Sequence, residues 1–142
     1  MSLARFCRPV ISSDEGELVA ETAKKMRNAR VGCVVVTRAE RPIAIVTDRD
    51  LALRVVADAR APQITALRDV ATYDPIVVRD EDGIETVLGL MAKHGVRRLP
   101  VVSEGGHLLG IVTADDLTVL LGRQLSELAE GIRENADATE SR

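Results

Sequence analysis

The chain has 142 residues, 46% of them hydrophobic, which is enough for one domain or for two small units that share a core. A net charge of −3 gives no overall attraction for nucleic acid, and with 1% aromatic residues the chain lacks a platform on which bases would stack. No apolar stretch reaches the roughly 18 residues of a membrane span, so we expect a cytoplasmic protein that engages neither membranes nor nucleic acids.

Residues 5–60 predict a first unit of alternating strands and helices. One segment follows the i, i+3, i+4, i+7 rhythm of an amphipathic helix, and two short runs rich in β-branched residues are typical of buried strands. In chain order, the expected elements are an extended piece from Pro9, a helix over 18–29, strands over 31–36 and 43–46, and a second helix over 51–60. Residues 61–71 follow as a linker.

Residues 72–124 predict a second unit that repeats the first at an offset of 65 to 66 residues. Gly105 and Gly106 indicate a tight turn between its two central strands. In chain order, the expected elements are an extended piece from Pro75, a helix over 84–92, a strand over 96–101, a strand ending at Val112, and a second helix over 117–132.

The last helix continues beyond the repeat, into an extension over residues 125–142. Its apolar side chains form a stripe at near-helical spacing, longer than the repeat requires. The stripe consists of Leu117, Leu121, Leu125, Leu128 and Ile132. Two interpretations stay open, packing on its own unit and contact with another subunit. The polar residues 135–142 predict a frayed end.

The phrase IVTDRDL returns 66 residues later as IVTADDL, so that Thr47 and Asp50 (the first junction) recur as Thr113 and Asp116 (the second junction). One interpretation is a capping box, in which the Thr hydroxyl accepts a bond from the third helical N–H and the acid reaches back. Asp is short for that reach. The other is a nucleotide site, in which the helix N-terminus and the Thr bind phosphate and the Asp accepts bonds from ribose.

Over roughly residues 5–124 the two units resemble a pair of CBS (cystathionine-β-synthase) domains, together a Bateman module. The motifs that carry the resemblance are GIVTADD from Gly110, AIVTDRD from Ala44 and HGVRRLPVV from His94. The resemblance implies an α/β (α+β) fold, a tandem repeat of two β-α-β-β-α units related by a pseudo-twofold axis, with their sheets packed together. It also implies a homodimer, and clefts for an adenosyl ligand such as AMP, ADP, ATP, NAD or S-adenosylmethionine.

In that family the Asp of the motif holds the ribose, the Thr meets phosphate, a basic pair before LPV faces the phosphates, and backbone groups meet the base. The ligand-binding residues implied for this chain are Thr47, Asp50, Thr113, Asp116, Arg97, Arg98, Arg49, Val31 and Val96. Ala44 replaces the motif glycine in the first unit, where we expect it to narrow the pocket. Because that unit also lacks an arginine pair, we expect a singly occupied cleft to involve the second junction.

No pattern in the chain indicates catalysis or a metal site. Neither histidine has a visible partner for nucleophilic catalysis, and Cys7 and Cys33 are interpreted as free thiols. We therefore expect a stand-alone regulatory pair without enzyme activity or an obligatory cofactor. Its ligand would change the angle between the units, and an unknown effector protein would read that change. The alternative is a structural dimerisation module that binds no nucleotide.

Overall fold

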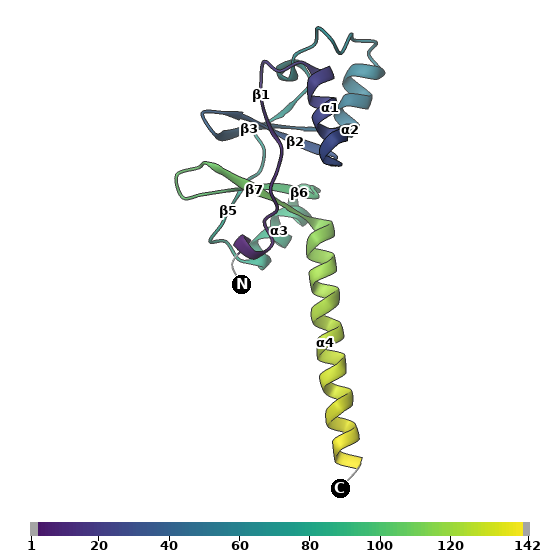
Figure 1. Ribbon diagram of the computed structural model, residues 1–142. Coiled ribbons are helices and arrows are strands. Elements are labelled where there is room, and N and C mark those ends of the chain that lie inside the picture. The colour runs from purple at the N-terminus through teal and green to yellow at the C-terminus, as the bar shows by residue number, and fades with distance from the viewer. Residues whose placement is uncertain (1–2, 141–142) are drawn as a thin grey trace.

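The computed structural model describes residues 3–140 and contains two β-sheets, one in each unit (Figure 1). The strands are Ser12–Asp14 (β1), Cys33–Arg38 (β2), Arg41–Thr47 (β3), Thr72–Tyr73 (β4), Val78–Arg79 (β5), Arg98–Val102 (β6) and Leu108–Thr113 (β7). The sheet orders are β1-β2-β3-β4 and β5-β6-β7. In each unit the first strand pairs parallel with the second, and the second pairs antiparallel with the third. The predicted tandem α and β fold is confirmed.

Except for the last, which projects away from the body, the helices lie on the outer sides of the two sheets. They are Val19–Ala29 (α1), Asp48–Leu51 (α2), Ile84–His94 (α3) and Ala114–Glu140 (α4), with short turns at Leu3–Arg5 (η1), Ala52–Val56 (η2, a π-helical turn) and Leu67–Asp69 (η3). Figure 1 shows α1 and α2 at one end of the body and α3 at the other, with the sheets between them. The first unit's second helix starts at Asp48, three residues before the expected position, because Thr47 caps it.

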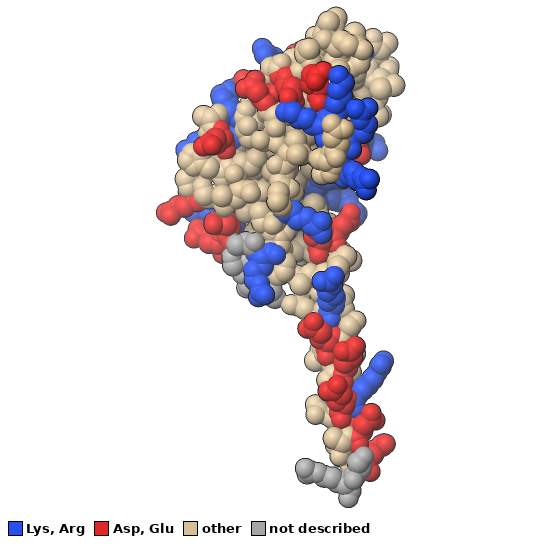
Figure 2. Space-filling view, viewed as in Figure 1, with Lys and Arg blue, Asp and Glu red and all other residues tan. Residues whose placement is uncertain are grey.

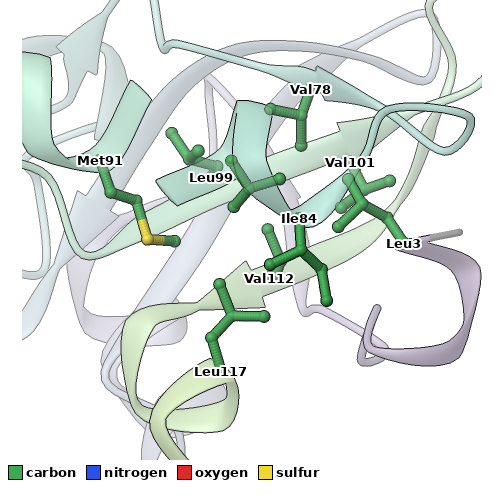
Figure 3. Packing of buried hydrophobic residues seen from close by; sticks show 9 residues of the cluster. Leu3, Val78, Ile84, Met91, Leu99, Val101, Val112 and Leu117 are labelled. Carbon is green, nitrogen blue, oxygen red and sulfur yellow. The ribbon is translucent and has the colours of Figure 1, made fainter. Parts of the chain in front are cut away.

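Each unit has its own apolar core between its sheet and its helices. The first core contains Val19, Val36, Ala44, Val46, Val55, Leu67 and Val70. The second, shown in Figure 3, contains Leu3, Val78, Ile84, Val87, Met91, Leu99, Val101, Val112 and Leu117. Burying one such aliphatic side chain is worth about 1.5–3 kcal/mol before entropy is counted. These cores therefore fix the strands that end at the two junctions.

The two units exchange short segments at the edges of their sheets. Tyr73, which follows the linker, pairs antiparallel with Ala44 of the first unit's β3. Arg8, which precedes β1 of the first unit, forms an antiparallel bridge with Ile111 of the second unit's β7. Leu3 lies in the second core. Each of these two segments therefore belongs to one unit by its position in the sequence and to the other unit by its packing.

Helix α4 projects away from the body (Figure 1). Among its described residues only Leu117 is buried, while Leu125, Leu128 and Ile132 are exposed. The interpretation that the stripe packs on its own unit is therefore wrong beyond the first turns. The helix runs to Glu140 where the sequence predicted a frayed end. Within residues 3–140 no helix combines the length and the apolar character that crossing a membrane requires.

Candidate ligand-binding cleft

A cavity of about 320 Å³ lies between the two units, at the first junction. Three segments that are distant in sequence line it: the end of β3 with the start of α2, the chain around β4, and the residues that lead into β6. The lining residues are Ile45, Thr47, Asp50, Thr72, Tyr73, Asp74, Pro75, Ile76, Val96, Arg97, Arg98 and Leu99. Its volume lies within the range of small-molecule sites, about 300–1,000 Å³.

The first junction forms a complete capping box on this cavity. The Thr47 hydroxyl accepts a hydrogen bond from the Asp50 N–H at 3.1 Å, and Asp50 Oδ2 accepts one from the Thr47 N–H at 2.9 Å. The expectation that Asp is too short to reach back is wrong here. The other carboxylate oxygen, Oδ1, lies 3.8 Å from Arg54. Capping therefore occupies one oxygen of Asp50, and the other has Arg54 as a distant ion-pair partner at the edge of the cavity that Asp50 lines.

The second unit contributes two arginines to the same cavity. Arg97 forms an ion pair with Asp115 at 2.5 Å, and both side chains are largely exposed, so this pair is weak in water. For Arg98, no carboxylate of the described residues 3–140 lies within ion-pair distance. Its guanidinium lies beside Gly32, close enough for a Cβ there to touch it. Within the described part of the chain Arg98 therefore forms no ion pair, although the Asp48 carboxylate lies beside the same glycine.

The structure corrects the grouping expected for the arginines. The sequence placed Arg97 and Arg98 with the second junction, because they belong to the same unit. Instead they line the cavity of the first junction. The reason is the arrangement of the units, which brings the start of β6 in one against the start of α2 in the other. A cleft is thus built from both units.

At the second junction the acid has a different partner. The Thr113 hydroxyl still accepts a hydrogen bond from the Asp116 N–H at 3.1 Å, but Asp116 Oδ1 pairs with Arg8 at 2.7 Å. A cavity of about 310 Å³ at Asp116 is lined by Arg5, Phe6, Cys7, Arg8, Asp116, Val119, Leu120 and Arg123. Thr113 and Val31 line neither this cavity nor the one at the first junction.

The first residue of each motif also has a different role from the one expected. Ala44 is fully buried in the first core, while Ile45 and Thr47 line the cavity, so Ala44 does not narrow it. A Cβ at Gly110 would collide with the Arg8 carbonyl and the Cys7 sulfur. The glycine of the second motif is therefore explained by the N-terminal segment that crosses β7.

The remaining candidate residues lie outside the cavity. Arg49 is exposed on α2 and Val31 is exposed before β2, and neither lines it. Burial raises the pKa of the Cys7 and Cys33 thiols, which keeps both neutral and weakly nucleophilic. Within residues 3–140 no three His, Cys, Asp or Glu side chains gather as metal ligands would.

The sequence did not identify the residues around β4 as part of the site. Tyr73, Asp74 and Ile76 line the cavity, although the sequence indicated only an extended piece beginning at Pro75. Tyr73 is one of only two aromatic residues of the chain and stands next to the extended piece. That isolated aromatic residue was the one available signal. Ile45 and Leu99 were missed because their pattern is that of ordinary strand residues.

Comparison with known proteins gives a consistent result. The family model described as CBS domain matches residues 5–57 and 67–123. Protein MK0525 of Methanopyrus kandleri is 38% identical over 111 residues, which are 78% of this chain and 57% of that protein. YlbB of Bacillus subtilis is 39% identical over 121 residues, 80% of each chain. Among solved structures, the CBS domain protein PAE2072 from Pyrobaculum aerophilum, complexed with AMP, has a TM-score of 0.76 and 30% identity, covering 86% of this chain and 97% of that one.

Proposed function

This chain belongs to the CBS domain family, with two copies of the domain, and on that basis we propose that it is a regulatory pair that binds an adenine nucleotide between the copies. The observation that carries the proposal is the cavity in which Asp50 of the first copy and Arg98 of the second meet. A carboxylate suits the hydroxyls of a ribose, and an arginine suits a phosphate. The AMP bound to the similar protein PAE2072 supports the same ligand class.

The rest of the cavity fits the base of such a ligand. Tyr73, Ile76 and Leu99 supply an aromatic ring and aliphatic surface, against which a flat purine can pack. Val96, two residues before β6, offers its backbone carbonyl to the purine edge, since its N–H already donates to the Met91 carbonyl. Arg97 supplements Arg98 once its exposed pair with Asp115 opens. AMP, ADP and ATP are therefore preferred over adenosyl ligands without phosphate.

The proposed mechanism is a ligand-linked change in the angle between the copies. A ligand that contacts both copies stabilises the arrangement in which both contacts are made, by at most its difference in affinity for the two arrangements. The protein would act in the cytoplasm, without an obligatory cofactor, and pass the change to an effector protein. We also propose a homodimer, because several large apolar side chains of the described residues are exposed.

Thermal unfolding and calorimetry with AMP, ATP, S-adenosylmethionine and adenosine test the proposal. A nucleotide at 100 times its Kd should stabilise the fold by about 2.7 kcal/mol. Arg98→Ala should weaken AMP binding about tenfold, the loss of one charge-assisted contact, and leave adenosine nearly unchanged. Arg49→Ala is the matched control, since this arginine lies outside the cavity. Equal losses for AMP and adenosine would contradict the phosphate role of Arg98.

A second candidate function is a structural module that binds no nucleotide. The complete capping box of Thr47 and Asp50 favours it, because that box alone gives the motif a structural role. The Arg8–Asp116 pair favours it at the second junction. The same titrations separate the two functions: no response to any of the ligands at millimolar concentration would support the structural module.

A further inference from the structure

The outer part of α4 carries an apolar stripe that nothing in the described chain covers. Leu121 is 38% exposed, Leu125 67%, and Leu128 and Ile132 each 62%. Figure 1 shows the helix standing clear of both sheets, and the CBS domain match ends at residue 123. A helix this exposed gains no tertiary packing for its apolar face, so its stability needs a partner. We infer that α4 pairs antiparallel with α4 of a second copy of this chain.

The spacing of the stripe is that of a helix-pairing seam. Successive stripe residues from Leu121 to Ile132 are separated by four, three and four positions, and the pattern extends to Thr118 and Asn135. The positions that flank the seam are small or uncharged, which allows two helices to approach closely. They are Gly122, Gln124, Ala129, Gly131, Ala136 and Ala138. Charged residues are confined to the outward positions.

The stripe is complementary to itself when the second helix runs in the opposite direction. Placing Leu125 opposite Leu128 of the other copy also places Leu121 opposite Ile132. The next layer at either end then joins the polar residues Thr118 and Asn135. Apolar residues thus meet apolar ones over four layers, with a polar layer at each end that fixes the register.

Charge selects the antiparallel direction over the parallel one. The outer part of α4 is acidic, through Glu127, Glu130, Glu134, Asp137 and Glu140 against a single Arg133, as Figure 2 shows along the projecting helix. The arginines at the base of α4 line a cavity on the face opposite the stripe, where Arg8 pairs with Asp116. Antiparallel pairing keeps the two acidic ends at opposite ends of the helix pair, whereas parallel pairing would place them side by side.

Analytical ultracentrifugation of the full chain tests the seam. Leu125→Glu/Leu128→Glu should raise the dissociation constant at least about 100-fold, because central apolar residues dominate such contacts. Ser126→Glu/Arg133→Gln makes the same change in charge on the outward face and should leave it within about threefold. Because Leu125 and Leu128 have little contact within the chain, far-ultraviolet circular dichroism of the body should be retained. Equal dissociation constants for wild type and the leucine variant would overturn the proposal, as would a monomeric wild type.

Spin labels test the direction, in a chain with Cys7 and Cys33 replaced by serine and the fold checked by circular dichroism. With a helical rise of about 1.5 Å per residue, antiparallel pairing puts labels at Ser126→Cys of two copies almost level. Labels at Glu140→Cys would then lie about 40 Å apart along the axis. Short distances at both sites would overturn the antiparallel direction. Binding to anionic phosphatidylglycerol vesicles that displaces self-association would assign the stripe to a membrane instead, against its acidic outward face.

Discussion

The first and second junctions share a cap and differ in the partner of the acid. In both, the threonine hydroxyl accepts the N–H of the residue three positions on, at 3.1 Å. Asp50 returns its carboxylate to the Thr47 N–H, whereas Asp116 gives it to Arg8. The two carboxylates are nearly equally accessible, 17% and 19% exposed. The difference is therefore one of neighbours and not of burial.

The neighbours differ because a different segment crosses the sheet next to each junction. The first junction faces the chain around β4 and, across the cleft, Arg98. The second faces the N-terminal segment, whose Arg8 pairs both with the backbone of β7 and with Asp116. The duplicated motif thus supplies the same threonine cap twice, and the segment that crosses each sheet decides which groups surround the acid.

The largest expected effect comes from substituting the first residue of each motif, Gly110 or Ala44. Gly110→Ala should destabilise the fold by roughly 3 kcal/mol, because the new methyl meets the Arg8 carbonyl and the Cys7 sulfur, and backbone must shift. Ala44→Gly should cost about 1 kcal/mol, through strand flexibility and a lost buried methyl. Urea unfolding measures both. Equal losses of unfolding free energy in the two variants would show that the N-terminal segment is not packed tightly against β7 at Gly110.

The next-largest effect distinguishes Asp50 from Asp116 by their contributions to AMP binding. Asp50→Asn should weaken AMP binding about 100-fold, since the single acceptor oxygen of the amide cannot serve both the Thr47 N–H and the ribose hydroxyls. Asp116→Asn, the same change at the equivalent position, should leave AMP affinity within about twofold because it lies outside that cavity. Isothermal calorimetry gives both constants. A larger loss of AMP affinity in Asp116→Asn than in Asp50→Asn would place the AMP site at the second junction.

Much of the fold follows from local sequence, because periodicity and turns are local properties. The repeated phrase, the helix around Met91 and the Gly105–Gly106 turn identified both units and the order of their elements. The doubled Thr and Asp located both junctions. These signals depend on residues within one or two turns of each other, and packing between the units does not alter them.

The composition of the cleft depends on how the units are placed, which no local pattern encodes. Arg98 lines the cavity of the other unit's junction, and Tyr73 belongs to the first sheet although it follows the linker. Ala44 faces the core because β3 is paired in one register, and a shift by one residue would have turned it to the cleft. The exposed face of α4 depends in the same way on where the helix leaves the body.

The caps themselves should respond equally. Thr47→Ala and Thr113→Ala should each lower the free energy of unfolding by about 1 kcal/mol, since each removes one hydroxyl acceptor from a helix N-terminus. The bond from the Thr47 N–H to Asp50 does not involve the threonine side chain and should survive. Serine at either position should restore most of the loss. Chemical denaturation of the four variants checks this, and a Thr47→Ala loss twice that of Thr113→Ala would show that the reciprocal bond depends on the hydroxyl.

The smallest effect should come from the ion pair that distinguishes the second junction. Arg8 is 70% exposed, so water and salt screen its pair with Asp116, and Arg8→Ala should cost at most about 0.5 kcal/mol. The backbone bridge of Arg8 to Ile111 does not need the side chain and should persist. Arg8→Lys, which keeps the charge, is the matched control. Denaturation at low and at 1 M salt should show a difference between wild type and Arg8→Ala only at low salt. AMP affinity should not change. If calorimetry instead finds a second AMP site in Arg8→Ala, then the ion pair, and not the shape of the cavity, prevents AMP from binding at the second junction.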